Sequence, residues 1–149
     1  MSYWEYVSQK LSSNPYVIGF DPLNEPLPGA KNIKEFITNI LPGQFDKNQL
    51  TPLYERIYKK YKAADPESIM YFEPGQFPDI LVSIPGIDVN IINPLGFPSP
   101  PGGDFGSPYH VLNDHTYCCQ VAPSMCSENG EPKPEAAAQC KKYHEERIG

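Results

Sequence analysis

Apolar and polar positions follow a helical spacing in two separate stretches of the chain. In residues 3–11, apolar side chains recur close to i, i+3 and i+4 after Ser2, a residue type that caps helices, and this spacing predicts an amphipathic helix. A shorter helix is expected over 33–40. Residues 50–64 predict the clearest helix, because apolar side chains line one face. Its opposite face carries charged residues: Glu55, Arg56, Lys59, Lys60 and Lys62.

Short apolar segments separate these helices and predict buried strands. They cover residues 16–23, 68–72 and 111–116, the last within a longer stretch at 109–117. Helices and strands that alternate in this way indicate an α/β protein in which the three strands are parallel neighbours. In such sheets functional residues gather at the carboxyl ends of the strands.

Proline and glycine determine how the remaining segments are interpreted. The stretch 75–108 is rich in both and is predicted to be an elaborated surface loop. A final helix is expected over 135–148, entered from Pro134. With 18 prolines and 11 glycines among 149 residues, of which 40% are hydrophobic, the chain is interpreted as one loop-rich unit over 1–149 rather than as a disordered protein.

The charge balance excludes two classes of partner. A net charge of -6 without a cluster of basic residues argues against nucleic acid and against an anionic membrane surface. No apolar run reaches the ~18 to 20 residues needed to cross a bilayer, so stable membrane insertion is not expected. Polar residues interrupt the start of the chain where a signal peptide would be apolar.

Candidate chemistry lies where the predicted strands end. Asn24 and Glu25 directly follow the strand at 16–23, and Glu73 follows the strand at 68–72. Partial burial would raise the pKa of Glu25 into a range suited to acid/base catalysis, and the amide of Asn24 is suited to binding a substrate hydroxyl. Without the strands, Asn-Glu-Pro would be read as ordinary turn chemistry.

His115 and Tyr117 mark the end of the third strand. They are two positions apart, so both side chains face the same side of an extended chain and can share a pocket. Taken alone, a hydrogen-bonded core histidine and a packing aromatic are the simpler interpretation.

Three segments resemble one enzyme family. They are VIGFDPLNEP at 17–26, LTPLYERIYKKYKAADPESIMYFEP at 50–74 and VLNDHTYCC at 111–119. In this order they resemble the endoglycoceramidases of glycoside hydrolase family 5. The resemblance implies part of a (β/α)8 TIM barrel, about strands four to six with flanking helices. It also implies retaining hydrolysis of the bond between oligosaccharide and ceramide in glycosphingolipids, without a metal or organic cofactor.

The resemblance also assigns roles to the candidate residues. Glu25 matches the acid/base, Asn24 the partner of the sugar 2-hydroxyl, and His115 and Tyr117 a His-x-Tyr motif in which the tyrosine lies near the nucleophile. The family's nucleophile is a glutamate after the seventh strand, which this sequence does not include, so we interpret the chain as a central fragment and expect it to be inactive alone.

Glu73 is a second carboxylate at the same edge of the predicted sheet. Neighbouring strands lie ~4.8 Å apart and a retaining pair of carboxyl groups ~5 to 5.5 Å apart, so Glu73 is geometrically able to act as the nucleophile. The family pattern instead favours a substrate-hydroxyl ligand or a local hydrogen-bonding anchor.

The four cysteines, Cys118, Cys119, Cys126 and Cys140, lack the spacing of a zinc site. We expect at least one disulfide from Cys118 or Cys119 to Cys126 or Cys140, and hence a secreted or lysosomal parent protein, although four free buried thiols remain an alternative.

Other interpretations of function stay open. They are a non-catalytic glycan-lipid binding or decoy chain, another family 5 hydrolase of the endoglucanase type, and a gene fragment that does not fold.

Overall fold

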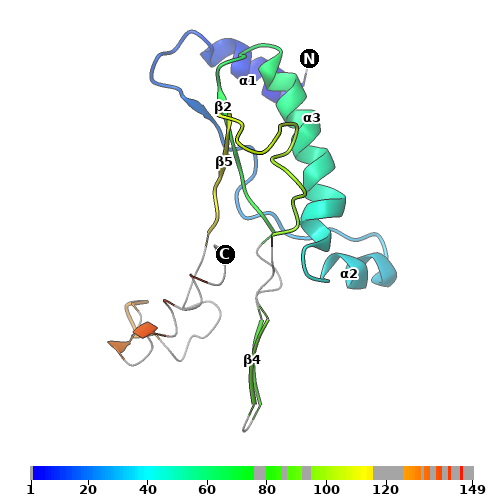
Figure 1. Ribbon diagram of the computed structural model, residues 1–149, viewed down its shortest axis with the longest axis vertical. Coiled ribbons are helices and arrows are strands. Elements are labelled where there is room, and N and C mark those ends of the chain that lie inside the picture. Colours follow the sequence, from blue (N-terminus) through cyan, green and yellow to red (C-terminus); the bar gives the residue numbers. More distant parts are fainter. Residues whose placement is uncertain are drawn as a thin grey trace.

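The computed structural model describes residues 2–75, 80–84, 87–91, 95–115, 126–131, 133–134, 137–138, 141 and 145. Helices and strands alternate as far as β2, and three further strands follow (Figure 1). In chain order the elements are α1 (Tyr3–Leu11), β1 (Gly19–Phe20), α2 (Ile33–Asn39), the π-helical turn η1 (Asp46–Leu50), α3 (Thr51–Lys62), β2 (Ile69–Phe72), β3 (Ile80–Ile84), β4 (Ile87–Ile91) and β5 (His110–Leu112).

The helices predicted over 3–11, 33–40 and 50–64 are confirmed. Ser2 caps α1 as predicted, since its hydroxyl accepts from the backbone N–H of Glu5 while the Glu5 carboxylate accepts from the N–H of Ser2. Asn32 caps α2 in a similar way, accepting from Glu35. Both caps satisfy amides that the first helical turn leaves without a partner.

The three predicted strands form one parallel sheet in the order β1-β2-β5. Gly19 pairs with Ile69 in β2, and Met70 pairs with His110 in β5. The prediction of parallel neighbours is therefore confirmed, although the ladders are shorter than the apolar segments. At Gly19 a Cβ atom would lie 2.2 Å from the carbonyl oxygen of Ile69, so this close approach requires glycine.

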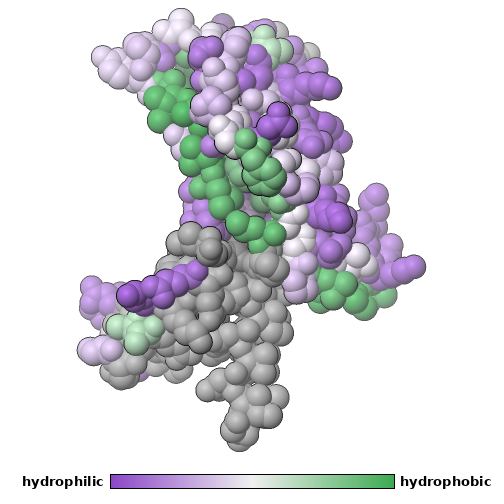
Figure 2. Space-filling model, in the orientation of Figure 1, coloured by the Kyte–Doolittle hydropathy of each residue, from purple (hydrophilic) through white to green (hydrophobic). Residues whose placement is uncertain are grey.

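Helices α1 and α3 cover one side of this sheet and create the core (Figure 1). The Phe20 ring lies 6.0 Å from the ring of Trp4 and 5.6 Å from that of Tyr61. The buried core residues are Phe20, Phe45, Leu50, Tyr54, Tyr61, Met70 and Phe72. Hydrophilic residues cover the side on which α3 lies (Figure 2), which agrees with the amphipathic pattern predicted for that helix.

Lys62 is an exception to the predicted charged face of α3. Its side chain is partly buried, with Nζ 3.7 Å from the ring centroid of Tyr109 and donating to the carbonyl of Ser68 at 3.1 Å. The Lys62 side chain thus links the carboxyl end of α3 to the turn that follows it. Helical spacing alone does not reveal such a contact, because it depends on a residue far away in sequence.

The prediction of a surface loop over 75–108 is wrong in part. Strands β3 and β4 pair as an antiparallel hairpin with Val82 opposite Val89 (Figure 1). The sequence signal is Pro85-Gly86 between two runs rich in β-branched residues. Most of the final helix predicted over 135–148 lies outside the described residues and stays a prediction.

Candidate active site

Glu25 follows β1 in an unusual backbone conformation. Its φ of 46° lies in the left-handed region, and it is the one non-glycine residue there in the part of the chain that the structure describes. A residue with a Cβ atom adopts this conformation at a cost of about 1 to 2 kcal/mol. A contact with the surroundings must stabilise this conformation. The backbone N–H of Glu25 donates to Glu73 Oε2 at 2.6 Å.

Glu73 directly follows β2 and is fixed at both its side chain and its backbone. Its relative exposure is 1%. Besides the bond from Glu25, its Oε1 lies 3.4 Å from Asn113 Nδ2 and 3.4 Å from His115 Nε2. The Tyr54 hydroxyl of α3 donates to the carbonyl of Glu73 at 3.1 Å and accepts from its N–H at 3.2 Å. Glu73 therefore joins the sheet, helix α3 and the Glu25 loop.

His115 lies just beyond β5, between two carboxylates. Nδ1 is 3.1 Å from Glu25 Oε1, and Nε2 faces Glu73. The hydrogen bond with Glu25 raises the pKa of His115, and the negative charges of Glu73, Glu25 and Asp21 add to this effect against a smaller opposing effect of burial. The arrangement favours the imidazolium form.

Burial raises the pKa of the Glu73 carboxyl, and the nearby charge of Asp21 acts in the same direction. The N–H of Glu25 and the imidazole of His115 oppose this rise. Asp21 itself accepts a hydrogen bond of 2.6 Å from Asn113 Nδ2. Asp21 and Asn113 were not predicted from the sequence, although each lies at or just after a strand end, where functional residues are expected.

The structure brings together three of the five predicted site residues: Glu25, Glu73 and His115. Asn24 is exposed beside Glu25. Tyr117 lies outside the described residues, so the shared concave surface predicted for it and Glu25 stays a prediction. The same holds for the disulfide, because Cys118, Cys119 and Cys140 lie outside them too.

The part of the chain that the structure describes lacks a metal-binding cluster and a membrane-spanning helix. It contains no cluster of three or more histidine, cysteine or acidic side chains arranged to hold a metal ion. No helix within it is long and apolar enough to span a membrane.

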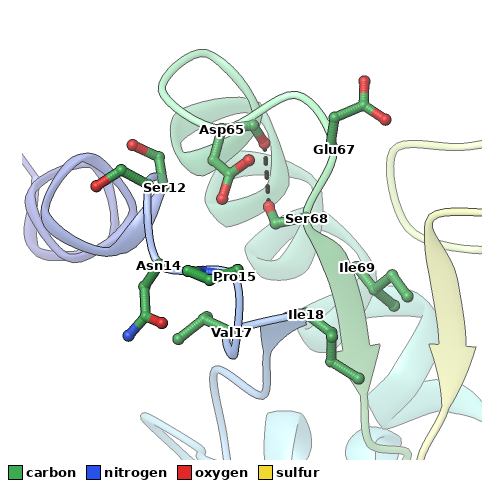
Figure 3. A pocket seen from close by; sticks show the side chains of 10 residues that line it. Ser12, Asn14, Pro15, Val17, Ile18, Asp65, Glu67, Ser68 and Ile69 are labelled. Atoms are coloured by element: carbon green, nitrogen blue, oxygen red, sulfur yellow. Dashed lines mark hydrogen bonds between the residues drawn. The ribbon is translucent and has the colours of Figure 1, made fainter.

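A hollow of about 510 Å³ lies at the opposite edge of the sheet (Figure 3). It is lined by residues that precede β1 and β2, among them Asn14, Asp65 and Ser68, and the Ser68 hydroxyl donates to the Asp65 carbonyl at 3.0 Å. Parallel α/β sheets carry their chemistry at the carboxyl ends of strands. Because the hollow lies where the strands begin and the candidate site lies where they end, the two are separate.

The pH dependence of stability tests the charge state of His115. A raised pKa means that the folded state favours the protonated imidazole, so this stabilisation is complete below the ordinary value of 6.5 and disappears as pH rises through the folded pKa. We expect the free energy of unfolding of the wild type to exceed that of His115→Gln most at pH 5.5, with the gap narrowing towards pH 9. Urea unfolding across this range measures it.

His110 provides the matched control. Burial lowers its pKa, so the neutral ring is favoured in the folded state and the difference between wild type and His110→Gln should change with pH in the opposite sense. A gap between wild type and His115→Gln that stays constant from pH 5.5 to 9 would contradict the imidazolium assignment.

Fold and site together define an α/β chain with a three-stranded parallel sheet and an acidic site at the carboxyl ends of its strands. No protein-family model matches the chain. Two curated proteins named endoglycoceramidase are similar to it. The one from Hydra vulgaris is 28% identical over 115 residues, which is 77% of this chain and 19% of the relative. The one from Cyanea nozakii is 29% identical over 115 residues, or 77% of this chain and 20% of the relative.

Solved structures of endo-glycoceramidase II from Rhodococcus sp. share the fold. The complex with ganglioside GM3 superposes with a TM-score of 0.64 at 15% identity, covering 95% of this chain and 26% of the neighbour. The complex with a five-membered iminocyclitol gives 0.62 at 16% identity, covering 94% and 26%. The resemblance to endoglycoceramidases and the partial barrel fold are thus confirmed. The chain spans about a fifth of the length of its curated relatives.

Proposed function

We propose that this chain supplies the acid/base half of a retaining glycosidase site that separates oligosaccharide from ceramide in glycosphingolipids. The observation that carries the proposal is the position of the Glu25 carboxylate, at the carboxyl end of the sheet and 3.1 Å from His115 Nδ1. The similarity to endoglycoceramidases supports the substrate class.

The chemistry assigned to Glu25 has two steps. Its carboxyl group protonates the glycosidic oxygen as the bond to ceramide breaks, and the resulting carboxylate then removes a proton from the water that attacks the sugar. Asn24 is proposed to bind the sugar 2-hydroxyl. His115 orients the Glu25 carboxyl group, and Tyr117 is proposed to lie beside the nucleophile.

The nucleophile of the retaining route requires a second accessible carboxylate. Glu73 is a poor candidate, because it is 1% exposed and its two oxygens already face Glu25, Asn113 and His115. We therefore keep the proposal that the nucleophile comes from a later strand of the barrel. Glycan binding without catalysis is the alternative that the same experiment decides.

The test is release of intact oligosaccharide from lactosylceramide or ganglioside GM3. The purified 149-residue chain and its Glu25→Gln and Glu73→Gln variants should all show background turnover, because one carboxylate cannot complete a retaining reaction. A polypeptide extended from the transcript to include the remaining barrel strands should release the oligosaccharide.

Two outcomes of this assay would contradict the proposal. Turnover by the 149-residue chain that either substitution abolishes would mean that the nucleophile lies within the chain, with Glu73 the leading candidate. An extended protein that binds the glycosphingolipid without cleaving it would favour the binding or decoy function.

We propose the secretory pathway as the location of the parent protein, an assignment supported by the predicted disulfide.

A further inference from the structure

We propose that Glu73 is a positioning residue that holds both Glu25 and His115 in place, and that it is not a ligand of the substrate. The proposal rests on the function proposed for Glu25, since it concerns the residue behind it. It replaces the sequence-based expectation that Glu73 binds a substrate hydroxyl, and it makes the anchor interpretation specific. Three observations support it: the burial of Glu73, the backbone of Glu25, and the orientation of the His115 ring.

Burial removes Glu73 from the reach of a sugar. A residue that binds a substrate hydroxyl needs a free lone pair facing the open site, whereas the carboxylate of Glu73 is 1% exposed. Oε2 receives the N–H of Glu25, and Oε1 lies at 3.4 Å from Asn113 Nδ2 and His115 Nε2. Glu25 is more accessible, with a side chain that is 34% exposed.

The first positioning contact acts on the backbone of Glu25. Left-handed backbone conformations are unfavourable for residues with a Cβ atom and persist only where the surroundings hold them. The bond of 2.6 Å from the N–H of Glu25 to Glu73 Oε2 is charge-assisted and short, which is typical of a strong hydrogen bond. It fixes the direction in which the Glu25 side chain leaves the loop.

The second positioning contact acts on the imidazole of His115. Because Nε2 faces Glu73, the other ring nitrogen is turned towards Glu25 Oε1 at 3.1 Å. One buried carboxylate therefore contacts the acid/base residue at its backbone and, through the histidine, at its carboxyl group. Tyr54 anchors Glu73 in turn, by bonding to its N–H and its carbonyl.

A carboxylate can accept from the N–H of Glu25 and from a cationic His115 at the same time, whereas an amide cannot. Glutamine has one acceptor oxygen and one NH₂ group that only donates. If its oxygen accepts from the N–H of Glu25, its NH₂ group faces His115 Nε2, which can accept only when the imidazole is neutral. Glu73→Gln should therefore favour the neutral ring with its proton on Nδ1.

The test is NMR spectroscopy of the 149-residue chain, following the ring nitrogens of His115 and the backbone amide of Glu25. In Glu73→Gln we expect the pKa of His115 to fall by about 1 unit, because an opposite charge close to the ring is lost. We expect the ring nitrogens to report the tautomer with the proton on Nδ1. The amide of Glu25 should exchange with solvent at least about tenfold faster.

The matched control is Glu55→Gln, which removes the same charge from an exposed position on α3. It should leave both readouts unchanged. Unchanged values in Glu73→Gln as well would overturn the proposal. If Glu73→Gln does not fold, the wild type decides: the amide proton shift of Glu25 must follow the titration of the Glu73 carboxyl carbon with one midpoint, and independent titration would overturn the proposal.

These measurements do not depend on turnover, so the positioning role can hold even where the proposed hydrolysis fails. In a form of the protein that does turn over glycosphingolipid, Glu73→Gln should lower kcat and leave KM unchanged, because the acid/base is misplaced while substrate contacts remain. A raised KM with an unchanged kcat would instead make Glu73 a substrate ligand and overturn the proposal.

Discussion

Glu25→Gln is expected to lower the turnover of a ceramide-linked oligosaccharide by roughly 10³-fold in a form of the protein that carries both catalytic carboxylates. Ceramide leaves as an alkoxide unless its oxygen is protonated, so loss of the acid slows cleavage of the glycosidic bond. Nitrophenolate or fluoride leaves its glycoside without needing that proton. With such a substrate, formation of the glycosyl-enzyme should proceed almost normally, whereas its hydrolysis should be slow, because water then lacks a base.

Stopped-flow kinetics with the activated glycoside measure this difference. The variant should release a burst of leaving group equal to the enzyme concentration, followed by slow turnover. Azide attacks without needing a base, so it should accelerate the slow phase and yield a glycosyl azide. Glu55→Gln, with the same charge change on an exposed face of α3, should behave as the wild type. Equal losses in the rate of glycosyl-enzyme formation on ceramide-linked and activated substrates would contradict the acid/base role.

Asp46→Asn is expected to destabilise the fold by about 3 kcal/mol, because it leaves a buried backbone donor without an acceptor. The Asp46 side chain is fully buried at the start of η1. Oδ1 accepts from the N–H of Gly75 at 2.7 Å and Oδ2 from the N–H of Gly96 at 2.9 Å. An asparagine offers its NH₂ group to one of these donors, so that contact becomes repulsive.

Urea unfolding of the 149-residue chain measures the loss, with Asp104→Asn as an exposed control for the change of charge. The control should remain within about 0.5 kcal/mol of the wild type. A similarly small change in the free energy of unfolding of Asp46→Asn would mean that the segments at Gly75 and Gly96 do not depend on this carboxylate. Because Gly75 lies two residues after Glu73, weakening this contact should also loosen the candidate site.

Periodicity and strand-end logic predicted much of the architecture. Amphipathic spacing located α1 and α3, and the short apolar segments located three strands whose parallel order follows from alternation with helices. Placing Glu25, Glu73 and His115 at one edge required only that parallel strands point the same way. The proline and glycine content of 75–108 predicts a loop and obscures the hairpin of β3 and β4, although two runs rich in β-branched residues favour strands there.

The roles within the site depend on contacts that local patterns do not encode. Sequence places Glu73 at the edge of the sheet, but its contacts with the Glu25 backbone and with the Tyr54 hydroxyl join it to other elements. The bond between Asp21 and Asn113 joins residues 92 positions apart. Such pairs form only when tertiary packing fixes the loops that follow the strands.

The left-handed backbone at Glu25 places stability and activity in opposition at a single position. Glycine would adopt a φ of 46° without strain, so a search for more stable variants should favour replacing the glutamate there. Every such replacement removes the carboxyl group on which the proposed chemistry depends. A variant library screened by melting temperature alone would therefore be expected to select stable but inactive proteins at residue 25.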